Sequence, residues 1–441
     1  MNFRRIIIIN TAVYAALYSF FYLIAGEKMP EEWLFRTSLL LAVFFIVGYC
    51  FCFCLPKCSL WITIFLYHLA GSFLLKEIIF CKTGDIFGLY RGDGPKYHDF
   101  APETVGWSWN KTTYIQDLAV DDWGFPALLR GLYHWSENPE QYFSLLILAN
   151  SFCVAASSFF LYQAARKLLE KQYAKIAAII WGLSTYALFS TVHWLKENFF
   201  GAVIVLALYG LLDTCEKLRG RQLLTFWGAA FLTVFFRLAV PFIFLASFCG
   251  RFISVDFVKR HILFLAVTGA FLLFILLDPF LRLLGIPGGV EWILTVSTGR
   301  IQHIGGGFAF MLLIQCLSAL FGPFPNFIGQ QASPFFLYNF YLLLKCLLSI
   351  YFLYGFYLLY RNKSVYFPVA LTYWILNATM VVLSFVALDF RYHLTYYSLF
   401  LLLALYGFQE CSLSRNTIKR RACFLSGAIG ILLLIIFYNF R

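Results

Sequence analysis

Charged side chains are scarce in this chain of 441 residues: they make up 13% of the sequence, and only 22 residues are acidic. Soluble globular domains carry about 25% charged residues, so this chain has too little polar surface to face water on all sides. Hydrophobic residues account for 61% of the chain and aromatic residues for 20%, as lipid-facing surfaces and interfacial belts require. The composition excludes a soluble globular protein and indicates an integral membrane protein.

We expect no cleavable leader at the amino terminus. The first apolar run, residues 6–24, follows Arg4 and Arg5, and no small-residue cleavage site precedes Glu27. We interpret this run as a retained membrane span, with a signal peptide as the less favoured alternative.

The cysteine spacing also gives little evidence of a metal site, although the chain has twelve cysteines. Most of them lie inside apolar runs, where cysteine behaves as a small hydrophobic side chain. In the cluster at residues 50–58, Cys54 and Cys58 share a helical face. We expect packing or lipidation there, and metal binding is the alternative.

Apolar runs of about 17–25 residues, long enough to cross the hydrocarbon core, recur from one end of the chain to the other. The sequence predicts an all-α polytopic membrane protein with about thirteen transmembrane helices, organised as a single integral membrane domain over residues 1–441. The predicted spans are 6–24, 34–55, 59–76, 142–164, 175–192, 198–212, 222–236, 238–253, 261–277, 335–360, 366–386, 394–409 and 422–438.

Lysine and arginine gather in every second connection between these spans, as in 165–175 and 410–421, and most acidic residues fall in the others. Basic residues collect on the cytoplasmic side of a membrane. We therefore expect the amino terminus inside and the acidic loops 81–141 and 278–334 outside. The net charge of +12 then reflects membrane topology, so we expect membrane lipids and no nucleic acid among the partners.

Residues 307–325 break this alternation, because they are apolar but would invert every later connection if they crossed the membrane. We predict a re-entrant or interfacial element on the outer side, ended by Gly322 and Pro323. An alternative is that it pairs with 326–334, but that stretch is short and polar. Such backbone is tolerated at membrane depth only where protein or a water-filled cavity buries it. The segment thus predicts a functional cavity beside it.

The loop 81–141, which follows the third span, is the longest polar segment, and long ordered loops are usually functional. A Gly-Asp-Gly-Pro turn holds Asp93 at a tight bend, with Asp99 six residues further on. We predict that Asp93 is catalytic and that Asp99 is the fallback. Arg91 and His98 flank this turn as further candidates. The simpler interpretation is that Asp93 only caps a turn.

A second acidic pair in the same loop, Asp121 and Asp122, precedes Trp123 and Gly124. These two residues are further candidates for the site, and a solvated helix cap is the alternative.

Charged residues also stand at the outer ends of several spans. Lys196 and Glu197 precede the sixth span, Arg237 lies between the seventh and eighth, and Arg391 and His393 precede the twelfth. Charges at membrane depth are costly, so they face a cavity, pair together or hold a ligand.

The alternative for such charges is snorkelling to the interface, which we expect for Lys345. It explains Arg237 poorly, because that residue has no long polar loop beside it. Carboxylates and several cations on one face suit an anionic lipid-linked donor. Cations neutralise a phosphate or diphosphate leaving group, and a carboxylate accepts the proton of the attacking hydroxyl.

Five motifs follow one another along the chain: GDGPKYHDFA, HWLKENFFGAVIVLALYG, FFRLAVPFIFL, FGPFPNF and FRYHLTYYSLFLLLALYG. In this order they resemble the multispanning GT-C-type glycosyltransferases of bacterial envelopes, which are relatives of protein O-mannosyltransferases. They also resemble the Wzy-like polymerases of O-antigen and capsule clusters.

The GT-C resemblance implies a catalytic aspartate in the first outer loop, which falls on Asp93 or Asp99. Its Lys-Glu element falls on Lys196 and Glu197. Its Arg-Tyr-Arg element falls on residues 391–393, where a histidine replaces the second basic residue and makes the charge depend on pH. The first loop lacks an Asp-X-Asp or Asp-Glu pair, which favours lipid-linked sugar transfer or polymerisation over protein modification.

We therefore predict an inverting membrane glycosyltransferase or polysaccharide polymerase. It would take a polyprenyl-phosphate- or diphosphate-linked sugar donor and pass the sugar to a lipid-linked or polymer acceptor in cell-surface polysaccharide assembly, on the outer face of the bacterial inner membrane. Lys196, Arg237, Arg391 and His393 would bind the donor phosphate.

The alternative function is a flippase or transporter of lipid-linked sugars. Transporters often contain paired broken helices in matching halves, and no such repeat is visible in this sequence. A divalent cation shared by Asp93 and Asp99 is the only cofactor that the residues suggest. Two acids without a third ligand make a weak case for a metal site, so the sequence leaves the cofactor open.

Overall fold

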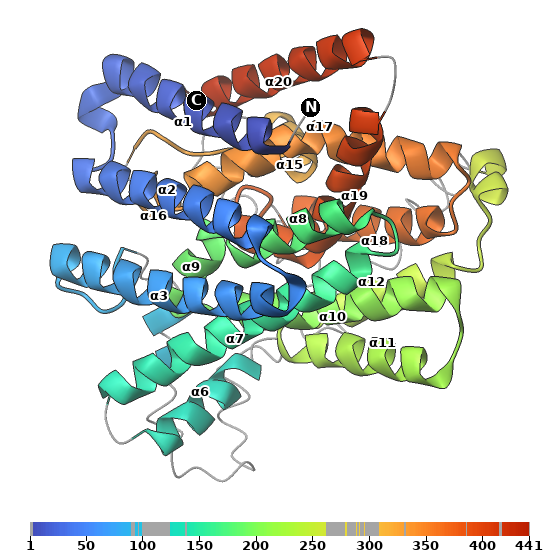
Figure 1. Cartoon of the computed structure of the whole chain (residues 1–441), viewed down its shortest axis with the longest axis horizontal. Coiled ribbons are helices and arrows are strands. Elements are labelled where there is room, and N and C mark those ends of the chain that lie inside the picture. The colour runs from blue at the N-terminus through green and yellow to red at the C-terminus, as the bar shows by residue number, and fades with distance from the viewer. Residues whose placement is uncertain are drawn as a thin grey trace.

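The computed structural model of the chain describes residues 3–89, 93–95, 97–98, 124–136, 139–261, 308–329, 332–384, 386–413 and 417–440, together with isolated positions between 278 and 295. Every regular element in these ranges is a helix, and most of the long ones run roughly side by side in one bundle (Figure 1). The fold class is all-α, as predicted.

The first part of the chain forms α1 (Phe3–Ala25), η1 (Gly26–Lys28), α2 (Glu32–Cys54), α3 (Lys57–Thr83), α6 (Gly124–Trp135), α7 (Pro139–Ala165), α8 (Lys171–Gly182), α9 (Thr185–Val192) and α10 (Glu197–Glu216). The second part forms α11 (Gly220–Leu232), η3 (Thr233–Phe235), α12 (Val240–Gly250), α15 (Phe308–Phe321), α16 (Ala332–Phe336), α17 (Asn339–Arg361), α18 (Tyr366–Leu383), α19 (Phe390–Leu413) and α20 (Thr417–Asn439).

Eight helices among the described residues are long and apolar enough to cross a membrane. The number becomes nine if α12 and Val255–His261, which are bent by 102° at a short break, form one broken span. The protein is thus a polytopic membrane protein. The count of thirteen is not reached in these residues and stays a prediction, as does the single domain. The predicted span 261–277 lies almost wholly outside the described residues.

The connections that carry the basic residues meet at one end of the bundle. The ammonium group of Lys167 lies 2.5 Å from the carboxylate of Asp213, and Lys363 pairs with Asp256 at 2.8 Å. The connections α2–α3, α10–α11 and α17–α18 accordingly lie at the same end in Figure 1, and α1–α2 lies at the other. Alternate connections therefore lie at opposite ends, as the charge pattern predicts.

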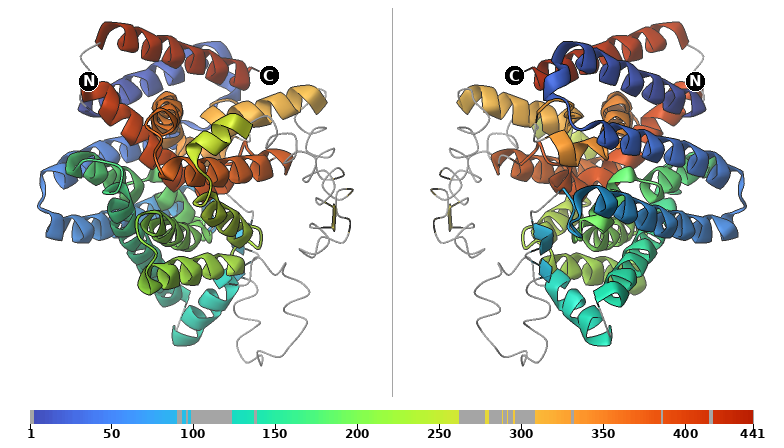
Figure 2. Two further views of the ribbon diagram at one scale, coloured as in Figure 1. Left: turned by 90° about the vertical axis from the view of Figure 1, so that its right-hand side faces the viewer. Right: turned by 90° about the vertical axis from the view of Figure 1, so that its left-hand side faces the viewer.

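The segment predicted to be re-entrant or interfacial begins with α15, which extends sideways from the bundle (Figure 2). Non-helical backbone follows it from Gly322 and returns to the end of the bundle that holds η1, where Gly329 N–H donates to Lys28 O at 2.8 Å. Asn339 and Asn439 donate to the carbonyls of Asn326 and Pro325, both at 2.9 Å. Irregular backbone at membrane depth must be covered in this way.

Helices α17 and α19 form the centre of the bundle, and nearly every residue in the first half of each is buried. They cross at two glycines. A Cβ on Gly355 would overlap the carbonyl oxygen of Leu403, and a Cβ on Gly407 would overlap that of Tyr351. The two backbones are therefore in direct contact at this crossing, where a larger side chain would have to separate them.

Candidate functional site

Asp93 lies in a short helical turn, residues 93–95, against the connection between α9 and α10. A Cβ on Gly94 would come within 2.5 Å of the carbonyl oxygen of His193, so only glycine permits this close approach. Trp194 adopts a left-handed backbone conformation (φ = 57°), which is strained for an aromatic residue. Its indole N–H donates to Ile86 O at 3.0 Å. The turn that carries Asp93 is therefore fixed on α9 and α10.

Arg391, at the start of α19, connects two carboxylates. Its Nη1 lies 2.7 Å from Asp93 Oδ2, and its Nε lies 2.8 Å from Asp389 Oδ2. The Arg391 side chain is 15% exposed and that of Asp93 is 49% exposed. Charge-assisted bonds of this length are among the stronger polar contacts in proteins. They join the predicted catalytic aspartate to a predicted phosphate ligand, although 298 positions separate the two residues.

Arg237 follows η3 and lies on the face of an aromatic ring. Its guanidinium carbon is 4.3 Å from the ring centre of Tyr392 and 5.6 Å from that of Phe200. Its Nε is buried and has no hydrogen-bond acceptor. Among the described residues, no carboxylate forms an ion pair with Arg237. A stacked guanidinium that has an N–H without an acceptor is suited to bind an anion.

Lys196 and Glu197 lie at the start of α10, with 7% and 3% of their surfaces exposed. Lys196 Nζ donates to the carbonyl oxygen of Phe236 at 3.2 Å, one residue before Arg237. The charges of Arg391, Lys196 and Arg237 all act on Glu197. The predicted candidates from α10, the η3–α12 connection and α19 therefore meet in one cluster.

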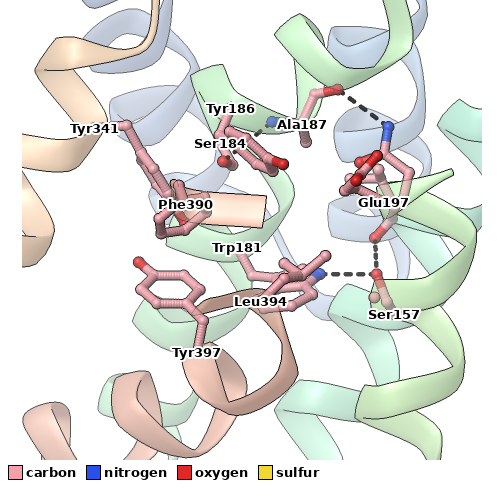
Figure 3. A pocket seen from close by; sticks show the side chains of 13 residues that line it. Ser157, Trp181, Ser184, Tyr186, Ala187, Glu197, Tyr341, Phe390, Leu394 and Tyr397 are labelled. Carbon is pink, nitrogen blue, oxygen red and sulfur yellow. Dashed lines mark hydrogen bonds between the residues drawn. The ribbon is translucent and has the colours of Figure 1, made fainter. Parts of the chain in front are cut away.

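A small cavity of about 20 Å³ lies beside this cluster. Figure 3 shows Glu197 and Tyr186 on its wall, with Trp181 and Phe390 as apolar neighbours. Oε2 of Glu197 and the hydroxyl of Tyr186 are buried and have no hydrogen-bond partner. Both polar and apolar side chains therefore line the cavity.

His98 belongs to the core and not to the charged cluster. Its Nδ1 lies 3.0 Å from the hydroxyl of Tyr142, and its ring packs on those of Phe143 and Trp194. Burial lowers the pKa of His98 to about 3, so the ring is neutral. Its neighbour Tyr97 points to the site: burial, followed by the charges of Asp93 and Glu197, raises the pKa of Tyr97 and keeps its hydroxyl protonated.

His393 lies beneath Arg391 and is fully buried. Its Nε2 donates to Ala387 O at 2.7 Å, and its Nδ1 lies 2.9 Å from Lys345 Nζ and 2.6 Å from the hydroxyl of Tyr396. Both ring nitrogens are thus occupied within the protein, and its role in phosphate binding stays a prediction.

The expectation that Lys345 snorkels is wrong, because this side chain is only 1% exposed. Its ammonium group donates to the carbonyl of Gly322, so the side chain points into the protein and not towards the membrane interface. The ammonium is stabilised instead by neutral acceptors and by the faces of Phe390, Tyr396 and Phe400.

Asp99, Arg91, Asp121 and Asp122 lie outside the described residues, so their predicted roles stay predictions. Within the residues that the structure does describe, no group of three or more metal-ligating side chains is present.

Three aromatic residues of the site were not predicted from the sequence: Tyr97, Tyr186 and Tyr392. Tyr97 and Tyr392 each lie within a few residues of a predicted charge, and a search for tyrosine next to such charges would have found them. Tyr186 lies eleven residues before Glu197 inside an apolar run, and nothing in its sequence context distinguishes it from a core residue.

No family model matches the chain, and no curated protein matches it. Among solved structures, the chain is similar to the archaeal oligosaccharyltransferase AglB from Archaeoglobus fulgidus, in complex with an inhibitory peptide and a dolichol-phosphate. The TM-score is 0.44 at 14% sequence identity, over 87% of this chain and 55% of that one. The chain thus spans about half the length of that enzyme, and a TM-score at this level does not establish a shared fold.

Proposed function

We propose that this protein is a membrane glycosyltransferase that uses a polyprenyl-phosphate- or diphosphate-linked sugar donor in cell-surface polysaccharide assembly. The proposal includes Wzy-like joining of repeat units. It also includes the finer topology: about thirteen passages through a bacterial inner membrane, with the amino terminus cytoplasmic and the charged cluster on the outer side.

Arg237 is the observation that carries the proposal. A guanidinium that is stacked on Tyr392 and has a buried, unpartnered N–H forms no ion pair among the described residues. Lys196 and Arg391 contribute to the same cluster through Glu197. A phosphate placed there would complete the hydrogen bonds of Arg237 and would meet three cations, as a phosphoryl leaving group requires.

Asp93 supplies the second half of the reaction. The acceptor hydroxyl attacks the anomeric carbon of the donor sugar, and the bond from that carbon to the phosphate oxygen breaks. The hydroxyl proton passes to the half-exposed Asp93 carboxylate, and the electron pair of the broken bond stays on the phosphate. Arg391 touches Asp93 directly, so it can hold the base and the leaving group in one geometry.

Binding of undecaprenyl phosphate to the purified full-length protein tests the donor site. Arg237→Ala should weaken binding by about 2–5 kcal/mol if the charge pair is buried, measured by microscale thermophoresis in detergent. Arg251→Ala is a matched control, because Arg251 also has a buried, unpartnered N–H and lies over an aromatic ring, but follows α12. Equal affinity of both variants and the wild type would overturn the proposal.

The alternative function, a flippase of the same lipids, differs in its products. A glycosyltransferase releases the polyprenyl carrier from a glycosylated donor, whereas a flippase leaves the donor intact. Incubation of the reconstituted protein with polyprenyl-linked sugars and an acceptor extract should therefore yield free polyprenyl phosphate or diphosphate. Transbilayer movement of intact donor without release would favour the flippase.

A further inference from the structure

The small cavity beside the charged cluster is enclosed by α7, α8, α9, α10, α17 and α19 (Figure 3). Its volume of about 20 Å³ holds one group of the size of a water molecule. Glu197, on its wall, is acted on by the same cations that would bind the donor phosphate. The cavity therefore lies next to the cations of the donor site.

Most polar groups on the cavity wall already have partners. The indole N–H of Trp181 donates to Ser157 Oγ at 2.8 Å, and the amide of Asn198 donates to Ala187 O at 3.0 Å. Glu197 Oε2 and the hydroxyls of Tyr186 and Tyr397 are the exceptions, although these residues are only 3%, 2% and 1% exposed. A buried polar atom without a partner is costly, so three of them on one cavity indicate a polar occupant.

The chemistry of the wall selects the class of occupant. A carboxylate oxygen accepts hydrogen bonds, and a tyrosine hydroxyl both donates and accepts. A hydroxyl group satisfies both at once, because it can donate to Glu197 and accept from Tyr186. A cationic group is disfavoured, since Lys196, Arg237 and Arg391 already act on Glu197.

We infer that this cavity is a specificity pocket for one hydroxyl group of the carbohydrate that the enzyme handles, an inference that rests on the proposed function. The phosphate of the donor binds the cations, and a single sugar hydroxyl enters the cavity between Glu197 and Tyr186. A sugar without that hydroxyl leaves the two buried polar groups unpaired, which weakens its binding about 5–150-fold.

Competition between two lipids tests this inference. The purified full-length protein is incubated with the polyprenyl-linked lipids extracted from membranes of its source organism, with undecaprenyl phosphate added. The retained lipids are then quantified by mass spectrometry. We expect the wild type to enrich glycosylated carriers over the bare carrier. Glu197→Gln and Tyr186→Phe should each lower that ratio about 5–150-fold while still retaining undecaprenyl phosphate.

Tyr14→Phe is the matched control, because it removes a buried tyrosine hydroxyl from α1, far along the chain from the cavity wall, and should leave the ratio unchanged. An unchanged ratio in both Glu197→Gln and Tyr186→Phe would overturn the pocket, as would a wild type that does not enrich glycosylated carriers. Failure of the wild type to retain either kind of lipid would instead overturn the proposed function. Tyr186→Phe keeps the volume of the side chain, so it tests the pocket even if Glu197→Gln does not fold.

Discussion

Arg391 and His393 lie two residues apart on α19, and each contacts charged groups in different surroundings. Arg391 bonds two carboxylates, Asp93 and Asp389, one of which is half-exposed. Two residues further on, His393 contacts Lys345, which has only neutral acceptors and aromatic faces around it. Neither Lys345 nor His393 is exposed beyond 1%.

The difference separates a site from a structural contact. Arg391 can exchange one of its anions for another, because Asp93 is accessible and water can reach the pair. Lys345 has no such partner to exchange, and its bond to Gly322 holds the non-helical backbone after α15 against α17. A buried cation is thus not evidence of a ligand site. The exposure and charge of the groups that contact a buried cation decide whether it can bind a ligand.

Removing the base should have the largest effect. Asp93→Asn keeps the shape of the side chain but cannot accept the proton of the acceptor hydroxyl, so turnover should fall about 10²–10⁴-fold. Release of polyprenyl carrier measures the rate, and thermal unfolding should be unchanged. Normal turnover in Asp93→Asn together with an inactive Asp99→Asn or Asp121→Asn would move the base to one of those residues.

Substitution of the deeper cation should affect stability instead. Lys345→Met keeps an unbranched side chain of similar length but leaves the carbonyl of Gly322 without its donor and removes one of the two contacts of His393 Nδ1, at about 2–3 kcal/mol of folding stability. Chemical denaturation in detergent measures the loss, and undecaprenyl phosphate affinity should stay at the wild-type value. A variant of normal stability that no longer binds the lipid would assign Lys345 to the site.

Acid should loosen the turn beneath Asp93. The pKa of His98 is lowered to about 3 by burial, against about 6.5 in an unfolded chain. The unfolded chain therefore binds the extra proton between these values, and stability is lost as the pH falls below 6.5. The loss reaches about 2 kcal/mol near pH 5. Hydrogen exchange of peptides spanning Asp93 and His98 should rise over this range. His98→Gln should abolish the pH dependence, and an unchanged profile would contradict the assignment.

The smallest effect is expected where charge is kept and geometry is lost. Arg391→Lys retains a cation but cannot bond Asp93 and Asp389 with one planar group, so donor affinity should fall by about tenfold. Isothermal titration with undecaprenyl phosphate measures it. The same conservative change at Arg361, in the last turn of α17, should leave affinity as it is. A tenfold loss there too would point to a general effect of lysine.

The parts of the fold that depend on composition could be predicted from the sequence. Charge alternation along the chain predicts which connections meet at one end, and the contacts of Lys167 and Lys363 agree with it. The failure of 307–325 to fit the alternation predicts a re-entrant or interfacial element. The described helix there is shorter than the candidate spans, and its place in the membrane stays a prediction.

The individual partners could not be predicted, because hydropathy does not say which face of a helix turns inward. Lys345 was expected at the interface and is in the core. His98 was a candidate for the site and packs against aromatic rings. The pair formed by Asp93 and Arg391 joins segments 298 positions apart, a distance that no local pattern covers.

The crossing of α17 and α19 has a consequence for how this protein diverges. Gly355 and Gly407 are each closed to any side chain by a backbone carbonyl of the opposite helix, whereas lipid-facing positions such as Leu353 need only stay apolar. Distant relatives should therefore share two glycines, fifty-two positions apart, after their apolar residues have drifted beyond recognition. That spacing, with an Arg-Tyr-His triplet between the two glycines at the start of the second helix, is a signature with which such relatives can be sought.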